Sequence, residues 1–131
     1  MKLASWEIQK AVVNHLKEVL SVPIFDGEAP SLTKFPYVVL GETTSASWRT
    51  KQSPGTQETI TIHVWTDRGG NKQCKGMMSQ ISEGLTSRAR LELEGFFVSG
   101  IRLELAETLK DPDGYRHGVL RFRFLIHERK G

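Results

Sequence analysis

The sequence predicts an α+β fold in the order α-β-β-α-β-β, with an antiparallel sheet of two hairpins and two helices packed on one face. Two amphipathic segments have helical spacing, three segments alternate with a period of two and a fourth is β-rich, and turn-forming residues separate the last two strands. A chain of 131 residues with 38% hydrophobic and 25% charged residues is typical of one globular domain. We therefore expect a single domain over residues 1–131.

The first helix is expected over residues 5–20. Its apolar positions share one side of a helix, and Ser5 and Glu7 suit its N-terminus as cap and first-turn acid. A second apolar stripe runs from Cys74 to Leu85 and predicts a helix ending near residue 88. Gly76 and Gly84 lie inside this helix, where glycine is costly, so we expect close packing or fraying there.

Two strands are expected on either side of a polar insertion. "FPYVVLGETT" (35–44) is β-rich, and "ETITIHVW" (58–65) alternates apolar and polar side chains. The residues between them are polar, basic and rich in turn formers, so we expect a mobile hairpin loop at 45–56. The stretch "VPIFDGEAP" (22–30) reads as a turn-rich connector.

The second hairpin is expected from Phe97–Leu109 and Val119–His127, joined by the turn "DPDG" (111–114). Matching the apolar faces places Leu103 near Phe122 and Glu104 near Arg121 on the other face. Eight residues are expected to share the core: Leu16, Ile60, Ile62, Ile81, Leu103, Leu105, Phe122 and Phe124.

Composition limits the class of protein. The net charge of +3 is spread along the chain, whereas nucleic-acid binders cluster their Lys and Arg. No apolar run is long enough to span a bilayer and no secretory signal pattern is present, so we expect no membrane partner and a protein that acts where it is made. A single cysteine, Cys74, excludes an internal disulfide and cysteine-rich metal motifs.

The polar residues do not predict catalysis. The four histidines lack the spacing of metal ligands, and His15 reads as a satisfied, semi-buried residue. "DRGGN" (67–71) lacks the lysine and Ser/Thr of a P-loop, and helix capping by Asp67 or Asn71 explains it better. Cys74 lies on an apolar stripe, and the acids of "DPDG" belong to a turn. We therefore expect no enzyme, no cofactor and no metal.

Candidate partner-binding residues are Trp48, Arg49, Lys51 and Trp65. Tryptophan beside arginine is the combination enriched at the energetic centres of protein interfaces, and it occurs here in the predicted loop. The alternative is a hairpin tip without contacts. Trp65 lies beside His63 on the less apolar face of its strand, as an exposed cross-strand pair or as a protein-contact surface.

Three stretches carry a family resemblance: "FPYVVLGETT", "ITIHVWTDRGGNKQC" and "DPDGYRHGVLRFRFLIHE". In this order, after an amphipathic helix, they resemble the tail completion, or tail-to-head joining, proteins of long-tailed bacteriophages, which are tail-terminator-like. The resemblance covers most of the chain and carries over no catalytic residue. It implies that the span between the first two strands, residues 45–56, is the variable region.

The resemblance implies a structural virion protein. It would form a ring, expected to be a hexamer, at the head-proximal end of the tail, between the tail tube protein and the head connector or stopper protein. It would assemble in the host cytoplasm and make at most a passing contact with DNA. Alone, it is expected to be a monomer or weak oligomer, because no extended apolar patch is visible in the sequence.

Two other functions stay open at this point. One is a small basic nucleic-acid-binding protein that grips phosphate through the hairpin loop and the C-terminal residues Arg129 and Lys130. The other is a transient assembly chaperone, which would be absent from finished particles.

Overall fold

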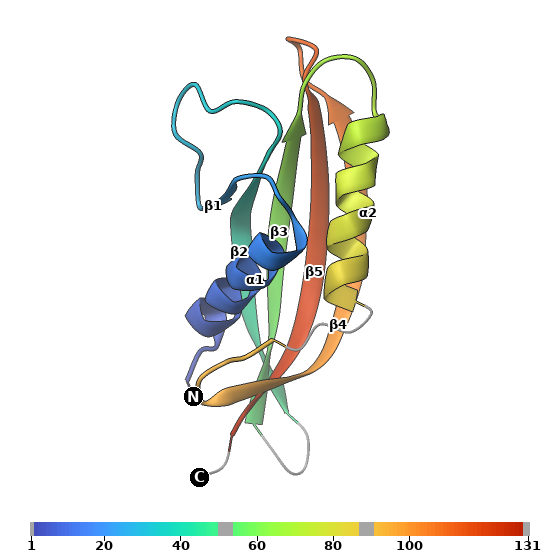
Figure 1. Ribbon diagram of the computed structural model, residues 1–131. Coiled ribbons are helices and arrows are strands. Elements are labelled where there is room, and N and C mark those ends of the chain that lie inside the picture. Colours follow the sequence, from blue (N-terminus) through green and yellow to red (C-terminus); the bar gives the residue numbers. More distant parts are fainter. Residues whose placement is uncertain (1, 50–53, 87–90, 130–131) are drawn as a thin grey trace.

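The computed structural model describes residues 2–49, 54–86 and 91–129. Within these residues the chain forms the elements α1 (Ser5–Val19), β1 (Ile24–Asp26), β2 (Tyr37–Arg49), β3 (Pro54–Thr66), α2 (Lys72–Thr86), β4 (Phe96–Lys110) and β5 (Arg116–Glu128). The strands form one sheet in the order β1-β2-β3-β5-β4 (Figure 1). Helix α1 packs on β1, β2 and β3, and α2 packs on β3, β4 and β5.

The α+β class is confirmed, but the sheet is mixed rather than purely antiparallel. The short strand β1 pairs parallel to Val38–Leu40 of β2, while the other neighbouring pairs are antiparallel. This stretch was expected to be a connector, because Pro23 and Gly27 bound it closely and three residues are too few to show a period of two.

The predicted loop at 45–56 is wrong for its described residues. Residues 45–49 extend β2 and residues 54–56 begin β3, in a regular ladder from Thr43↔Ile60 to Arg49↔Pro54. The same part of β3 also pairs with β5, from Gly55↔His127 to Thr59↔Arg123. Strand β3 is therefore held between β2 and β5, and its ladder orders residues 45–49, a polar segment that propensity alone assigns to a loop. Residues 50–53 lie outside the described part of the chain.

The core lies between the helices and one face of the sheet. Six of the eight predicted core residues are buried, and the pairing of Leu103 with Phe122 is confirmed. Leu103 itself is half-buried against the core, and the placement of Leu105 there is wrong, because its side chain is 38% exposed. A register shift between Leu103 and Leu105 turns Leu105 to the other face.

The same bulge changes the predicted ion pair. Glu104 contacts Arg123 instead of Arg121, since Leu105 occupies the position opposite Arg121. Both charged groups still lie on the face away from the helices, as the alternation predicted. The bulge therefore moves the partner of Glu104 by two residues along β5, from Arg121 to Arg123, without changing the face.

Helix α1 begins without the predicted cap. Ala4 occupies the N-cap position and has no side-chain cap hydrogen bond, so the assignment of Ser5 as cap is wrong. Glu7 does lie in the first turn: it forms an ion pair with Lys10 at 3.0 Å, and its carboxylate accepts a hydrogen bond from the Glu94 backbone at 3.2 Å. These contacts lower the pKa of Glu7.

The two helices meet at Gly84. A Cβ there would lie 3.3 Å from Val19, and His15 Nε2 lies 2.9 Å from the Gly84 carbonyl oxygen. Close packing at Gly84 and a satisfied, part-buried His15 are therefore both confirmed. None of the helices in the described ranges is long and apolar enough to cross a membrane.

The predicted turn before β5 is confirmed. The Gly114 N–H donates to the Asp111 carbonyl at 2.8 Å, and the Asp113 N–H donates to Asp111 Oδ1 at 2.7 Å. Gly114 adopts φ +92°, which favours glycine at this position.

Candidate partner-binding surface

The face of the sheet opposite α1 and α2, called here the open face, carries both candidate tryptophans. Alternation along β3 buries Ile60, Ile62 and Val64 against the helices, so Trp65 points the other way. Trp48 lies opposite Gly55 of β3. Gly55 and Trp65 are an even number of positions apart, so they lie on the same face. Ten residues of β3 separate Gly55 and Trp65, so the tryptophans lie about 30 Å apart. The structure therefore places them on one face but does not bring them together.

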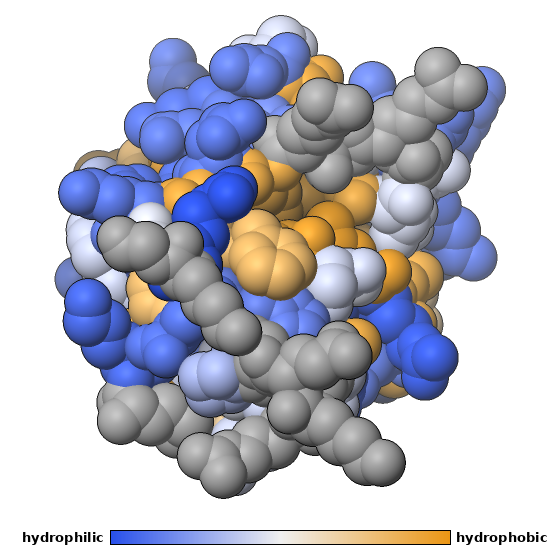
Figure 2. All heavy atoms as spheres, turned by 90° about the horizontal axis from the view of Figure 1, so that it is seen from below, coloured by the Kyte–Doolittle hydropathy of each residue, from blue (hydrophilic) through white to orange (hydrophobic). Residues whose placement is uncertain are grey.

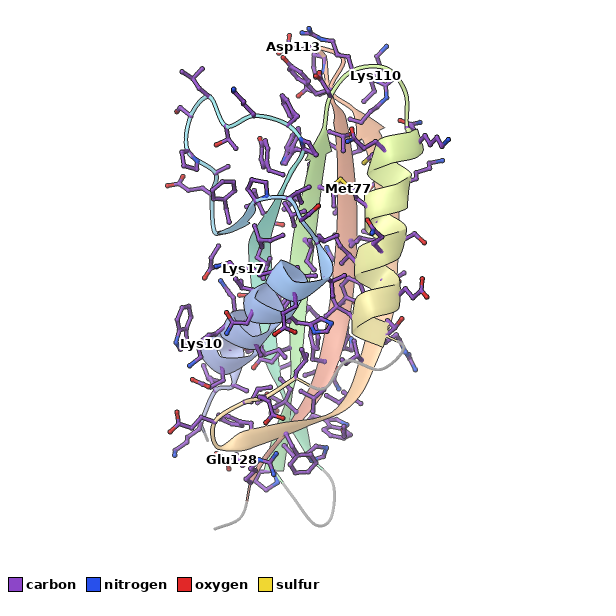
Figure 3. The ribbon with its side chains drawn as sticks, in the orientation of Figure 1. Lys10, Lys17, Met77, Lys110, Asp113 and Glu128 are labelled. Carbon is purple, nitrogen blue, oxygen red and sulfur yellow. The ribbon has the colours of Figure 1, made fainter. Side chains whose placement is uncertain are left out.

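The two ends of the sheet are chemically distinct. The hairpin end is where β2 joins β3, and the marked N and C ends of the chain lie near it (Figure 1). The turn end is where β4 joins β5. Lys110 and Asp113 label the turn end in Figure 3, and Glu128 labels the hairpin end.

Aromatic rings form a row across the hairpin end. The Trp48 ring meets His127 edge-on, with centroids 4.8 Å apart, and Phe97 stacks on the other side of His127 at 4.8 Å. The Arg129 guanidinium lies over Phe97, 5.8 Å from its centroid. His127 is buried, and its Nε2 lies 2.8 Å from Ser99 Oγ. Phe97 is 39% exposed, which makes it the most accessible ring of the cluster.

The row exists because residue 55 is glycine. A Cβ at Gly55 would lie 3.0 Å from Trp48 Cε3 and 2.6 Å from the Ile126 carbonyl oxygen. The position between Trp48 and His127 must therefore lack a side chain, which allows the indole to reach the histidine across β3. This is a close-approach role of glycine within a strand.

An open groove of about 560 Å³ adjoins the hairpin-end cluster. Its lining includes Trp48, Gln57, Arg102, Glu104, Arg123 and Leu125. The Arg123 guanidinium contacts both Glu104 and Gln57. Arg102 is exposed opposite Arg123, and no hydrogen bond or ion pair joins it to the described residues. The groove therefore presents a free cation beside apolar and aromatic walls.

The turn end holds a second, histidine-containing cluster. His117 stacks on Trp65, and His63 lies beside His117 with ring centroids 4.9 Å apart. His63 Nδ1 and His117 Nε2 are 2.7 Å apart, and His63 Nε2 is 3.1 Å from Glu42. The cluster lines an open depression of about 320 Å³ that also contacts Ala29, Tyr37 and Val39. Of the two readings of His63 and Trp65, the depression is compatible with a protein-contact surface, which stays a prediction.

The cluster lowers the pKa values of His117 and Glu42. Burial lowers the pKa of His117, and the charge of His63 lowers it further. Burial would raise the pKa of Glu42, but its hydrogen bond to His63 and the charge of that ring outweigh burial and lower it. The arrangement favours a neutral His117 and an ionised Glu42, linked through the two ring nitrogens of His63.

Further aromatic rings cover the turn end. Phe35 stacks between Tyr37 at 5.5 Å and Tyr115 at 4.3 Å, and the Arg68 guanidinium lies 4.6 Å from the Tyr115 centroid. His117 and these rings were not predicted as site residues from the sequence. They come from segments far apart in the chain, so no local spacing indicates their contact.

The remaining expectations about polar residues have mixed outcomes. Cys74 is buried, and burial raises the pKa of its thiol. Among the described residues, no group of three His, Cys, Asp or Glu side chains is placed to hold a metal ion. Arg49 ends β2, while Lys51 lies outside the described residues. Partner binding by Trp48, Arg49, Lys51 and Trp65 stays a prediction.

Known proteins match almost the whole chain. The family model "Tail completion protein gp17" matches residues 9–127. The tail completion protein gp17 of Bacillus phage SPP1 is 35% identical over 135 residues, which covers 96% of each chain.

Solved structures agree with this match. The structure of bacteriophage SPP1 gp17 is 32% identical, with a TM-score of 0.64 over 99% of this chain and 96% of that chain. A chain from the virion of a native gene transfer agent particle has a TM-score of 0.81 over 93% of this chain and 96% of its own. At 23% identity that chain shows the shared fold alone. This protein belongs to the gp17 family of tail completion proteins, which are structural proteins of bacteriophages.

Proposed function

We propose that the protein forms a ring at the head-proximal end of the phage tail and joins the tail to the head connector during virion assembly. The observation that carries this proposal is the 35% identity to the SPP1 tail completion protein over 96% of both chains. Tail completion requires contact with the tail, and joining requires a second contact with the head. A ring of identical subunits, with six as the expected number, supplies both contacts repeatedly around one axis.

The two ends of the sheet suit two different partners. The hairpin end offers the Trp48–His127–Phe97 row, and the turn end offers Trp65 stacked on His117. Figure 2 views the molecule from the hairpin end and shows hydrophobic surface gathered around the middle of that end. We assign one end to the tail tube protein and the other to the head connector or stopper protein, with Trp48, Arg49, Lys51 and Trp65 as contact residues.

The experiment is a joining assay with particles made without this protein. Heads and tails should then accumulate separately, and addition of the wild-type protein should restore joined particles in electron micrographs. Trp48→Ala and Trp65→Ala should each reduce joining at least tenfold. Trp6→Ala is the matched control, because Trp6 is 60% exposed on α1, away from the open face. Equal joining by all three variants would contradict the assignment of the open-face tryptophans.

Nucleic-acid binding is less well supported by the described surface. The open face carries Arg102, Arg121 and Arg123, but the acids Glu42, Glu104 and Glu107 lie among them. Interspersed signs give no continuous track for phosphate. A salt titration of binding to duplex DNA separates the two functions, because phosphate contacts would give tight binding that falls steeply with salt.

The proposed function also predicts the state and location of the protein. Its exposed large hydrophobic residues are distributed over several elements: Leu3, Trp6, Leu32, Phe97, Leu105 and Leu109. Sedimentation of the pure protein should therefore show a monomer or weak oligomer. Mass spectrometry of purified particles should find the protein in the finished virion, whereas a transient chaperone would be missing.

A further inference from the structure

Both edges of the sheet leave a length of strand without a partner. Strand β4 forms one edge, and the three-residue β1 forms the other. Because β1 pairs only with Val38–Leu40, the stretch 43–49 of β2 has no strand on its outer side among the described residues. Unpaired backbone N–H and C=O groups along an edge are a template for pairing with another strand.

Bulges divide each edge, and the longest regular run on each follows the last bulge. The ladder of β2 shifts between Leu40 and Thr43 and is then uninterrupted from Thr43 to Arg49. The ladder of β4 shifts twice, the second time between Leu103 and Leu105, and is then uninterrupted from Leu105 to Lys110. A bulge disrupts pairing locally, so these two runs are the parts of the edges best able to accept a strand.

The directions of the two runs suit a ring. The pairs β2–β3, β3–β5 and β5–β4 are all antiparallel, so β2 and β4 run in opposite directions. If neighbouring copies have the same orientation about an axis, β4 of one copy meets β2 of the next in antiparallel order. Two different edges in contact make a heterologous interface, which gives a ring when the rotation between subunits closes and does not give a two-fold dimer.

The side chains of the two runs are complementary in size. On the open face, Leu105 and Leu109 are 38% and 42% exposed, which leaves apolar surface along β4 uncovered. The corresponding face of β2 carries the small residues Thr44 and Ala46 beside Trp48. A pairing of β4 with itself centred on Glu107 would instead place two carboxylates opposite each other, which is unfavourable.

The helix side of the β4 run also has space for a neighbour. An open depression of about 420 Å³ lies there, lined by Lys75, Met78, Ala106 and Thr108. Ala106 and Thr108 alternate with the exposed leucines and therefore face the helices. A strand added to this edge would bring its own inward side chains into this depression.

The offset between the runs agrees with a closed sheet. Thr43–Arg49 lies level with residues 54–60 of β3, whereas Leu105–Lys110 lies level, through β5, with residues 61–66. This offset of about six residues is about 20 Å, and it accumulates over four strand spacings of about 4.8 Å each. The strands would then be tilted by about 45° from the ring axis, close to the tilt of closed sheets.

We infer that, in the ring, the run Leu105–Lys110 of one subunit pairs antiparallel with the run Thr43–Arg49 of the next. The inference rests on the proposed function, because it names the contact that closes the proposed ring. The partner at both edges is a second copy of this chain, and the pairing makes the sheet continuous around the axis. It covers Leu105 and Leu109 and places Trp48 at a subunit boundary.

Cysteine cross-linking tests this pairing directly. Ala46→Cys and Glu107→Cys replace exposed residues of the two runs, and the native Cys74 is fully buried and so protected from a short bismaleimide. The doubly substituted protein should cross-link into a ladder of multimers in assembled tails and, more weakly, in concentrated pure protein. Each single variant should stay monomeric, and a mixture of the two should give dimers only. Glu18→Cys with Glu107→Cys is the control pair and should give no ladder.

Results that contradict the strand pairing differ from results that contradict the joining function. Dimers of either single variant would indicate a two-fold contact and overturn the inference. Absence of a ladder in tails that still join to heads would also overturn it, while the proposed joining function would stand. Failure of the wild-type protein to restore joining would contradict that function. The pairing is then still decided by the concentrated pure protein, where an absent ladder overturns it.

Discussion

His117 lies flat against Trp65, with ring centroids 3.9 Å apart and an angle of 6° between the planes. The two residues are directly opposite each other on β5 and β3. His117 also contacts His63, which reaches Glu42. The cluster therefore ties three strands together at the turn end, and burial lowers the pKa of His117 within it.

The first prediction is that folding stability falls as the pH drops below neutrality. Because burial and then the charge of His63 lower the pKa of His117, the unfolded chain binds a proton at higher pH than the folded protein. The contribution of His117 is complete above its ordinary pKa of 6.5 and is lost as the pH falls through the lowered folded value. Urea unfolding between about pH 8 and about pH 5 measures this slope.

Two variants identify the group responsible. His117→Gln should flatten the slope, and His63→Gln should flatten it only in part, since burial of His117 remains. A His117→Gln protein with the full wild-type slope would show that another group is responsible.

A second prediction concerns the face of the last strand. Phe122 and Phe124 are fully buried, so truncation of either to Ala should lower the free energy of unfolding by about 3–5 kcal/mol. Leu105→Ala should cost less than about 1 kcal/mol, because this leucine lies on the open face. Chemical denaturation of the three variants checks the order. A larger loss at Leu105 than at Phe122 would reverse the assignment of faces.

Hydrophobic periodicity was enough to predict most of the fold. It placed both helices, three strands and the buried positions of β3 and β5, because burial of one face imposes alternation on a central strand, while β-rich composition placed β2. It failed at Leu105, where the letters still alternate but a bulge shifts the register. A bulge depends on pairing with a neighbouring strand, so the local pattern does not reveal it.

The candidate surface was less predictable than the fold. Trp48 and Trp65 were found from their residue type, but their contacts with His127 and His117 join segments more than fifty residues apart. The prediction of a loop around Ser45 was wrong for a related reason. Its ordering comes from β3, which is held between β2 and β5, and not from its own propensity.

The third prediction tests the order of that polar stretch. Glu58 is 1% exposed, and its Oε2 accepts a hydrogen bond from Ser45 Oγ at 2.5 Å, while Oε1 has no hydrogen-bond partner in the described structure. Ser45→Ala would remove the partner of a buried carboxylate and should lower the free energy of unfolding by about 1–3 kcal/mol. Ser47→Ala, two residues further along the same strand at an exposed position, should change it by less than about 0.5 kcal/mol. Equal effects of the two substitutions would mean that β2 does not hold Glu58 as the structure shows.

The last prediction is that substitution by alanine has opposite effects on stability at Gly55 and at Gly76. At Gly55 an added Cβ would meet the Ile126 carbonyl oxygen at 2.6 Å and the Trp48 ring at 3.0 Å. Since a backbone carbonyl in a sheet cannot move without breaking the ladder, Gly55→Ala should cost about 1–3 kcal/mol. It should also push the Trp48 ring away from His127, which a change in tryptophan fluorescence would report.

Gly76 is the matched control, because it lies within α2 and an added Cβ meets no atom within 4 Å. Gly76→Ala should raise the free energy of unfolding by about 0.5–1 kcal/mol, since alanine restricts the unfolded chain and favours the helix. The two substitutions add the same methyl group, so opposite signs can come only from the surroundings of each site. Stabilisation by Gly55→Ala would show that Trp48 does not cross β3 to reach His127, and the hairpin-end cluster would lose its structural basis.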